Sequence, residues 1–196
     1  MIPSVPLTID PLQDGELPIL HNLWSLYVHD MSSFVDQELG ADGRFPTRDF
    51  EAWLAEPDRH AFLFRVSGRL AGFALVRRGG RIVTGPDVWE IAEFFVVRRH
   101  RRSGVGTAAA HALFERFRGT WEVRELRDNK KAIAFWRRAI VEFTAGAMRE
   151  SIIDDQRWRG MVQWFESREP PSAPLSSDVL PSRYHPGAYD LRCLHP

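Results

Sequence analysis

Short apolar runs bounded by polar, turn-forming residues recur along the chain, and this pattern is typical of β-strands. The clearest case is a hairpin in which segments 61–66 and 70–76 flank the turn Ser67-Gly68-Arg69. A longer apolar run at 88–97 predicts a third long strand. The same pattern predicts further strands at 5–9, 121–126, 141–144 and 160–165.

Other segments repeat apolar residues every three or four positions, as helices with one buried face do. Asp10-Pro11 combines a helix-capping residue with proline, so a helix is expected to begin there and to run to Met31. A cap at Asp128 or Asn129 precedes another apolar stripe. The expected helices cover 11–31, 47–55, 104–118 and about 129–140, with a loop at 32–46.

The last 30 residues differ from the rest, because they hold six of the 13 prolines and no usable periodicity. Proline lacks a backbone N–H and breaks both helices and central strands. We therefore expect one domain over residues 1–166 and a Pro-rich C-terminal extension over residues 167–196.

The composition of the chain limits which partners, metal sites and cellular location are expected. The formal net charge is zero, with 26 basic and 26 acidic residues, so neither nucleic acid nor an acidic membrane surface is expected as a partner. Cys193 is the only cysteine, and no signal peptide or apolar run of membrane-spanning length is present. The histidines show no pair at metal-ligand spacing on one element, so no metal site is expected. We expect a cytoplasmic protein.

The most informative segment lies between the 88–97 strand and the next helix. Four arginines and a histidine precede Ser103, Gly104, Val105 and Gly106. A helix N-terminus offers unpaired backbone N–H groups, and glycine lets a ligand approach them closely. This order of strand, glycine loop and helix predicts a phosphate-binding cradle.

The motif Arg101-x-x-Gly104-x-Gly106 resembles the acetyl-CoA-binding loop of the GCN5-related N-acetyltransferase (GNAT) family. Asn129-x-x-Ala132-x-x-Phe135-Trp136 resembles the family's Asn-x-x-Ala-x-x-Phe-Tyr segment. Over residues 5–166, the order of elements also matches the family fold. The resemblance implies an α/β (α+β) fold with a mixed, mostly antiparallel central sheet flanked by helices.

The resemblance also implies a function: transfer of an acetyl group from the co-substrate acetyl-CoA to an amine, by direct attack. The 88–97 strand is expected to bulge, and its backbone is expected to pair with the pantetheine arm of CoA. The acceptor is expected to be a small-molecule or peptide amine, and a homodimer is left open. The expected CoA-binding residues are Phe94, Phe95, Val96, Arg101, Arg102, Ser103, Gly104, Val105, Gly106, Thr107, Asn129, Phe135 and Trp136.

Three positions depart from the family pattern. Arg98 stands where the family usually has proline, and Arg102 stands where it usually has glycine. Trp136 replaces a tyrosine that in many relatives returns a proton to the departing CoA thiolate. An indole N–H does not ionise near neutral pH, so Tyr27 or water is the candidate acid.

The catalytic base is open between two glutamates. Apolar neighbours disfavour the ionised form of a carboxyl group, so we favour Glu93, with Glu90 as the second candidate. On an ideal strand the two would face opposite ways, unless a bulge lies between them. For both residues, a structural carboxylate paired to an arginine is an equal alternative.

Other interpretations remain. Asp30, Asp36, Glu38 and Asp42 near the 32–46 loop would either attract a cationic amine or be solvated loop charges. Gly104-Val105-Gly106-Thr107-Ala108-Ala109 also fits a dinucleotide-binding fingerprint. A non-catalytic acyl-CoA-binding or regulatory module would equally explain the missing tyrosine.

Overall fold

The computed structural model describes residues 6–167. The C-terminal extension and the proposed domain boundary before it therefore stay predictions, apart from Ser167, which is buried. In chain order the elements are β1 (Leu7–Pro11), α1 (Leu17–Met31), α2 (Phe50–Ala55), β2 (Arg59–Val66), β3 (Arg69–Arg78), β4 (Val88–Val96), the 3₁₀ turn η1 (Arg98–His100), α3 (Val105–Arg116), β5 (Thr120–Leu126), α4 (Lys130–Thr144), β6 (Met148–Asp154) and β7 (Arg159–Glu166).

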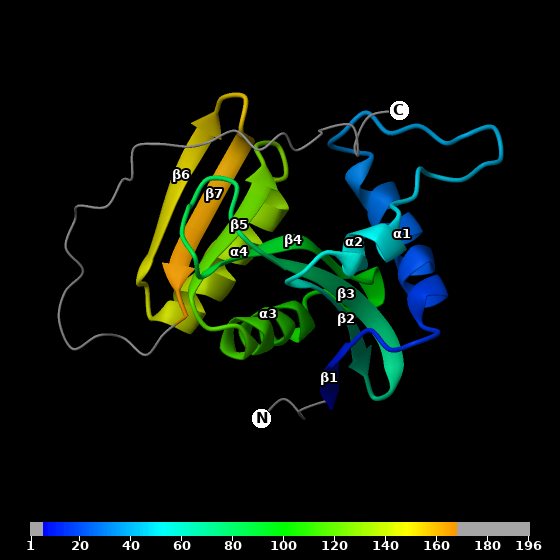
Figure 1. Cartoon of the computed structure of the whole chain (residues 1–196), viewed down its shortest axis with the longest axis horizontal. Helices are drawn as coiled ribbons and strands as arrows, with labels where there is room; N and C mark the ends of the chain where they lie inside the picture. The colour runs from blue at the N-terminus through cyan, green and yellow to red at the C-terminus, as the bar shows by residue number, and fades with distance from the viewer. Residues whose placement is uncertain (1–5, 168–196) are drawn as a thin grey trace.

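The strands form one sheet in the order β1-β2-β3-β4-β5-β7-β6 (Figure 1). Only β4 and β5 run parallel, and every other neighbouring pair is antiparallel. The predicted fold class, a mixed and mostly antiparallel sheet flanked by helices, is confirmed. A doubly wound parallel sheet, which a dinucleotide-binding fold requires, is excluded for the described residues.

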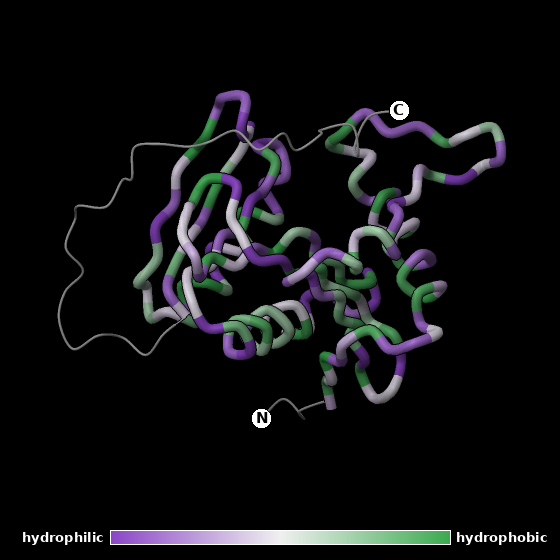
Figure 2. Tube along the Cα trace, in the orientation of Figure 1, coloured by the Kyte–Doolittle hydropathy of each residue, from purple (hydrophilic) through white to green (hydrophobic). Residues whose placement is uncertain are grey.

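Helices cover both faces of the sheet, and each face has its own core. On one face, α3 and α4 pack against alternate residues of the strands, such as Phe64, Ile91 and Trp121. On the other face, α1 and α2 cover Leu63, Phe73 and their neighbours. Figure 2 shows how apolar residues gather on α3 and the central strands. None of the described helices has the length and apolar character needed to span a bilayer.

Two expected elements are wrong. The segment 141–144 is not a strand but the last turn of α4, because its residues continue the helix and the turn comes at Ala145-Gly146. Asp10-Pro11 does not begin a helix but continues β1, where both residues pair with β2. Proline is tolerated there because β1 is an edge strand.

The helix caps explain where the other helices begin. The Asp49 side chain accepts a hydrogen bond from the Ala52 N–H, so α2 begins at Phe50 and not at residue 47. Of the two caps considered for α4, the structure uses Asn129, whose side chain accepts from the Ala132 N–H at 3.2 Å. Each cap satisfies a backbone donor that the helix itself leaves unpaired.

The sheet opens into a fork between its two parallel strands. Residues Val88–Ile91 of β4 pair with Thr120–Val123 of β5, and the ladder ends there. Beyond Ile91, β4 stays paired with β3 while β5 stays paired with β7. Among residues 6–167, no strand pairs with the edge of β4 that would face β5 from Ala92 to Val96, and this edge runs towards the N-terminus of α3. Its last carbonyl, that of Val96, accepts a hydrogen bond from the Arg101 side chain.

Candidate active site

The glycine loop leads into the N-terminus of α3, as predicted, and residues 102–107 there are called the cradle below. Gly104 caps the helix with φ +84°, in the left-handed region that favours glycine. A Cβ built on Gly104 would meet no atom within 4 Å, so the space in front of the first helical turn is open. The N–H groups of Val105, Gly106 and Thr107 have no intrahelical acceptor, since they lie in that turn. These residues fit an anionic ligand such as a pyrophosphate.

Arg102 occupies the position where the family usually has glycine, and its backbone explains that preference. Its φ is +62°, a backbone conformation that residues other than glycine, asparagine and aspartate rarely adopt. The residue is exposed at the rim of the cradle. The chain therefore accepts backbone strain at this position and gains a cation beside the open N–H groups.

Arg101 points away from the cradle and ties the loop to α1. Its Nε donates to the Val96 carbonyl at 2.6 Å, and its Nη2 pairs with Asp30 at the end of α1. Arg98 pairs with the same carboxylate at 2.7 Å. Partial burial opposes ionisation of Asp30, but the hydrogen bonds from both arginines outweigh it and lower the pKa of Asp30. Asp30 thus holds the loop against the helix.

The Asn129 segment lies beside β4, as the resemblance implied. Phe135 stacks on Phe94 with ring centroids 6.0 Å apart, and Trp136 meets the same ring edge-on at 4.9 Å. Trp136 is only 5% exposed. Phe94, Phe135 and Trp136 therefore line the α4 side of the fork together.

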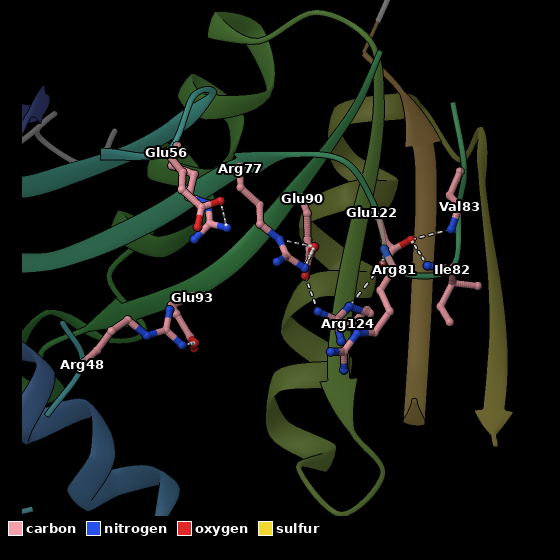
Figure 3. Close-up of polar contacts among 11 residues, drawn as sticks. Arg48, Glu56, Arg77, Arg81, Ile82, Val83, Glu90, Glu93, Glu122 and Arg124 are labelled. Atoms are coloured by element: carbon pink, nitrogen blue, oxygen red, sulfur yellow. Dashed lines mark hydrogen bonds and ion pairs between the residues drawn. The ribbon is translucent and has the colours of Figure 1, made fainter. Parts of the chain in front are cut away.

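Glu93 and Tyr27 come together on the opposite side of β4, below α1. The Tyr27 hydroxyl donates to Glu93 Oε2 at 2.5 Å. Arg48 Nη2 pairs with Glu93 Oε1 at 3.1 Å (Figure 3). Burial, aided by the Glu93 carboxylate, raises the pKa of Tyr27 well above its ordinary value. The phenol therefore stays protonated near neutral pH and donates its hydrogen bond to Glu93.

A bulge in β4 brings the two candidate bases onto one face. Leu75 pairs with Glu93 and Val76 with Ile91, so Ala92 is the extra residue. Glu90 and Glu93 consequently both face the α1 side, although their separation in sequence is odd. The bulge that the resemblance implied is present.

Glu90 lies deep in a network of ion pairs. It is 1% exposed and pairs with Arg77 at 2.5 Å and with Arg124 of β5 (Figure 3). Arg124 also pairs with Glu122, which accepts hydrogen bonds from three consecutive backbone N–H groups at 81–83. Burial, with the nearby Glu90 carboxylate, raises the pKa of Glu122. This surrounding fits the structural interpretation of Glu90.

Sequence reasoning missed the partners of both glutamates. Arg48 lies just before α2, and nothing in its neighbourhood marks it as a partner of a residue 45 positions away. Arg77 and Arg124 had a weak signal, since each is a charged residue at the end or middle of an apolar strand. A charge in such a strand needs a buried counter-ion.

A groove of about 700 Å³ lies elsewhere, at the ends of α2 and α3. Its lining includes Leu12, Glu51, His60 and Arg116, and it contains no predicted site residue. Burial lowers the pKa of His60 there. Within residues 6–167, no three histidine, cysteine, aspartate or glutamate side chains gather in a way that could hold a metal ion.

Comparison with solved structures supports the fold. The ribosomal-protein-S18-alanine N-acetyltransferase of Escherichia coli superposes with a TM-score of 0.55 at 14% identity, covering 87% of this chain and all of that one. An acetyltransferase of Thermus thermophilus gives 0.55 at 18% identity, covering 81% and 94%. The spermidine N-acetyltransferase of Vibrio cholerae, solved with CoA and spermine, gives 0.56 at 13% identity, covering 82% and 95%.

Sequence comparison identifies the family. No curated protein matches the chain at a significant level. The model of the acetyltransferase (GNAT) family, however, matches residues 21–140, which include most of α1, the glycine loop and most of α4. The match covers more than half of the chain, and the protein therefore belongs to the GNAT acetyltransferase family.

Proposed function

We propose that the protein transfers an acetyl group from acetyl-CoA to an amine by direct attack. The observation that carries this proposal is the fork, in which the free edge of β4 leads from Ala92 to the open N-terminus of α3. An extended ligand with a phosphate group at one end fits such an edge, because strand-like pairing and helix N–H groups serve its two parts.

Different residues bind the different parts of acetyl-CoA. The N–H groups of the first turn of α3, with Arg102 beside them, bind the pyrophosphate. Phe94, Phe95 and Val96 offer backbone groups to the pantetheine arm, and Asn129, Phe135 and Trp136 surround its end. When bound, acetyl-CoA supplies an acyl group activated as a thioester. A backbone N–H on the Phe95–Val96 segment polarises its carbonyl.

Glu93 acts as the base. An ammonium has no lone pair, so an attacking amine must lose a proton. Glu93 accepts this proton, directly or through water, while Arg48 and the Tyr27 hydroxyl hold its carboxylate in place. Cys193 is the only thiol in the chain. We expect no acyl-enzyme, so Cys193→Ala should leave turnover unchanged, and labelled acetyl trapped on the protein would contradict direct attack.

The acceptor is an amine of a small molecule or a peptide. Among the structural neighbours, one is named for a protein alanine and one for spermidine, so the shared fold serves both kinds of acceptor. Like the Vibrio cholerae enzyme, an acetyltransferase of Bacillus subtilis was solved with CoA. These names support a CoA-type co-substrate and leave the choice between acceptors to experiment.

Calorimetry and a turnover assay test the proposal. Acetyl-CoA should bind and NAD should not, because the fork and the α3 cradle suit the former. A panel of polyamines, amino acids and peptide N-termini, with release of the CoA thiol as readout, should then identify an acceptor. Binding of NAD in place of CoA would overturn the proposal. Binding of CoA without turnover of any amine would favour the non-catalytic module.

A further inference from the structure

Glu125 is a buried acid without a partner. Its side chain lies on β5 and the residue is 4% exposed. Neither carboxyl oxygen has a hydrogen-bond partner among residues 6–167. Buried carboxyl groups are nearly always hydrogen-bonded, because an unpaired one loses its hydration and gains nothing in return. The exception calls for a physical reason.

The charged and polar groups around Glu125 come from four elements. Arg124 on its own strand is paired with Glu90 and Glu122, and Arg137 on α4 is paired with Glu150 on β6 at 2.9 Å. On β7, Gln163 donates to Glu150, and its Oε1 also lacks a partner within the described chain. Both guanidinium groups near Glu125 are thus committed to other carboxylates.

This environment keeps Glu125 protonated. Burial raises its pKa to about 8, the Glu150 carboxylate acts in the same direction, and Arg124 and Arg137 act against them. At neutral pH the group is therefore a carboxylic acid with a proton that it can donate. That value lies close to the ordinary pKa of a thiol, about 8.5, so a proton passes between the two at little cost.

Glu125 lies on β5 just beyond the point where β4 and β5 separate. The last parallel pair joins Ile91 and Val123, and Glu125 lies two residues farther along β5. It shares a face with Val123, the face that α4 covers. Phe94, on the same face of β4, contacts Trp136. Glu125 thus stands on the β5 wall of the fork, opposite the β4 segment assigned to the pantetheine arm.

We propose that Glu125 donates the proton that the CoA sulfur takes up when the acyl group leaves. This inference rests on the acetyl transfer proposed above. It supplies the acid that Trp136 cannot provide, while Tyr27 remains bound to Glu93 on the other face. Glu125 is then a catalytic residue for departure of the thiol, and Glu93 for activation of the amine.

The proton and electron balance closes. The nitrogen lone pair forms a C–N bond to the acetyl carbon, and the C–S bond breaks with its electron pair going to sulfur. Sulfur takes the proton of Glu125, which becomes a carboxylate beside Arg124 and Arg137. Nitrogen loses two protons in all, one when the ammonium becomes the free amine and one after the C–N bond forms. Glu93 accepts each in turn and passes it to solvent, and Glu125 regains one proton from solvent. The cycle therefore releases one proton in net, and the enzyme returns to its starting state.

The first test uses the unaltered protein and does not depend on turnover. Infrared difference spectroscopy near neutral pH, with carboxyl-labelled glutamate, should show the band of a protonated carboxyl group. Saturation with CoA should shift this band, and the analogue that lacks the sulfur should not. If CoA binds calorimetrically and the band is unchanged, the assignment of Glu125 is wrong while the proposed function stands. If CoA does not bind at all, the proposed function fails first.

The second test compares Glu125→Gln with Glu115→Gln, a control at an exposed glutamate of α3 that does not act on the pKa of Glu125. Glu125→Gln should lower kcat with acetyl-CoA by about 10²-fold and bind acetyl-CoA as before. The loss should shrink with an acetyl thioester of a more acidic thiol, which leaves without a proton. Glu115→Gln should keep turnover within a few-fold. An equal loss with both thioesters would overturn the proposal.

Discussion

At the scale of the single residue, the candidate base and the candidate acid named from the sequence prove to be bonded to each other. Tyr27 and Glu93 lie 66 positions apart, and the Tyr27 hydroxyl donates to the Glu93 carboxylate at 2.5 Å. Arg48 completes the group, and its guanidinium lies 4.8 Å from the centre of the Trp24 ring. The carboxylate is thus held in one orientation on the α1 side of β4.

Replacement of Glu93 by glutamine tests its role as the base. Glu93→Gln keeps the shape and removes the group that accepts a proton, so kcat should fall by about 10²-fold near neutral pH. The loss should be smaller at high pH, where the amine is already neutral. Affinity for acetyl-CoA, measured by calorimetry, should hardly change. The exposed Glu115→Gln is the control, and a pH-independent loss with unfolding would instead mark Glu93 as structural.

The pKa of Glu125 predicts a pH dependence of stability. The carboxyl titrates near 4.5 when unfolded and near 8 when folded. Between these values the folded protein holds a proton that the unfolded chain has released. Stability therefore falls as pH rises through this window, by about 1.4 kcal/mol per pH unit, and the loss levels off above pH 8.

Urea unfolding of wild type and Glu125→Gln at several pH values measures this effect. Glutamine does not titrate, so the free energy of unfolding of the variant should gain on that of wild type as pH rises from about 5 to about 8. The difference between the two proteins removes the contributions of other groups, such as Glu122. Parallel curves for the two proteins would show that Glu125 is ionised in the folded state.

At the scale of the element, two local irregularities build the site. The bulge at Ala92 turns Glu93 towards α1, and the left-handed residues Arg102 and Gly104 turn the chain sharply into α3. Strain at Arg102 costs of order 1 kcal/mol or more. It is retained where the loop must present both a cation and free N–H groups.

Replacement of Gly104 by valine tests the cradle. A β-branched residue is strained at φ +84°, and its methyl groups would occupy the open space before the first turn of α3. Affinity for acetyl-CoA should fall at least about 10-fold, or about 1.4 kcal/mol. Gly68→Val is the matched control, since Gly68 has φ +76° in the β2–β3 turn and equally open surroundings. Equal loss of binding in both would make the effect one of stability.

At the scale of the whole molecule, the sheet consists of two halves joined at one short ladder. Only residues 88–91 and 120–123 connect β4 to β5 by backbone pairing. The ion pairs of Arg77, Glu90, Arg124 and Glu122 cross the same junction and attach the 81–83 loop to it. The two halves of the sheet are therefore held together at the closed end of the fork, and β4 and β5 separate beyond it.

Glu90→Gln tests this junction. Removal of one charge from a buried pair leaves the guanidinium groups of Arg77 and Arg124 uncompensated, which costs about 3–5 kcal/mol. We expect a loss of that order in urea unfolding, with Glu166→Gln at the exposed end of β7 as the control. Unchanged stability with lost turnover would transfer the role of base from Glu93 to Glu90.

Most elements of the fold could be predicted from the sequence because their signals are local, but β6 (Met148–Asp154) was not among the expected strands. Apolar runs on both sides of a glycine turn mark the β2–β3 hairpin, helical spacing marks α1 and α3, and Asn129 caps α4 with its own side chain. Errors arose where two local signals compete. At 141–144 the composition favours a strand, but no helix-ending residue comes before Ala145-Gly146, so α4 continues to Thr144. Asp10-Pro11 has the composition of a helix start, but both residues belong to the edge strand β1.

The sequence by itself determined the glycine loop that leads into α3 and the Asn129 cap of α4, because each is a contiguous motif at the start of one helix. Only the tertiary structure decided the chemistry of the carboxyl groups. Whether a glutamate is a base, an acid or a structural anion depends on which charges surround it and on how much water reaches it. Arg48 reaches Glu93 from another element, Arg77 and Arg124 enclose Glu90, and no group pairs with Glu125 within residues 6–167. Those distances are set by packing across the sheet, which no local pattern records.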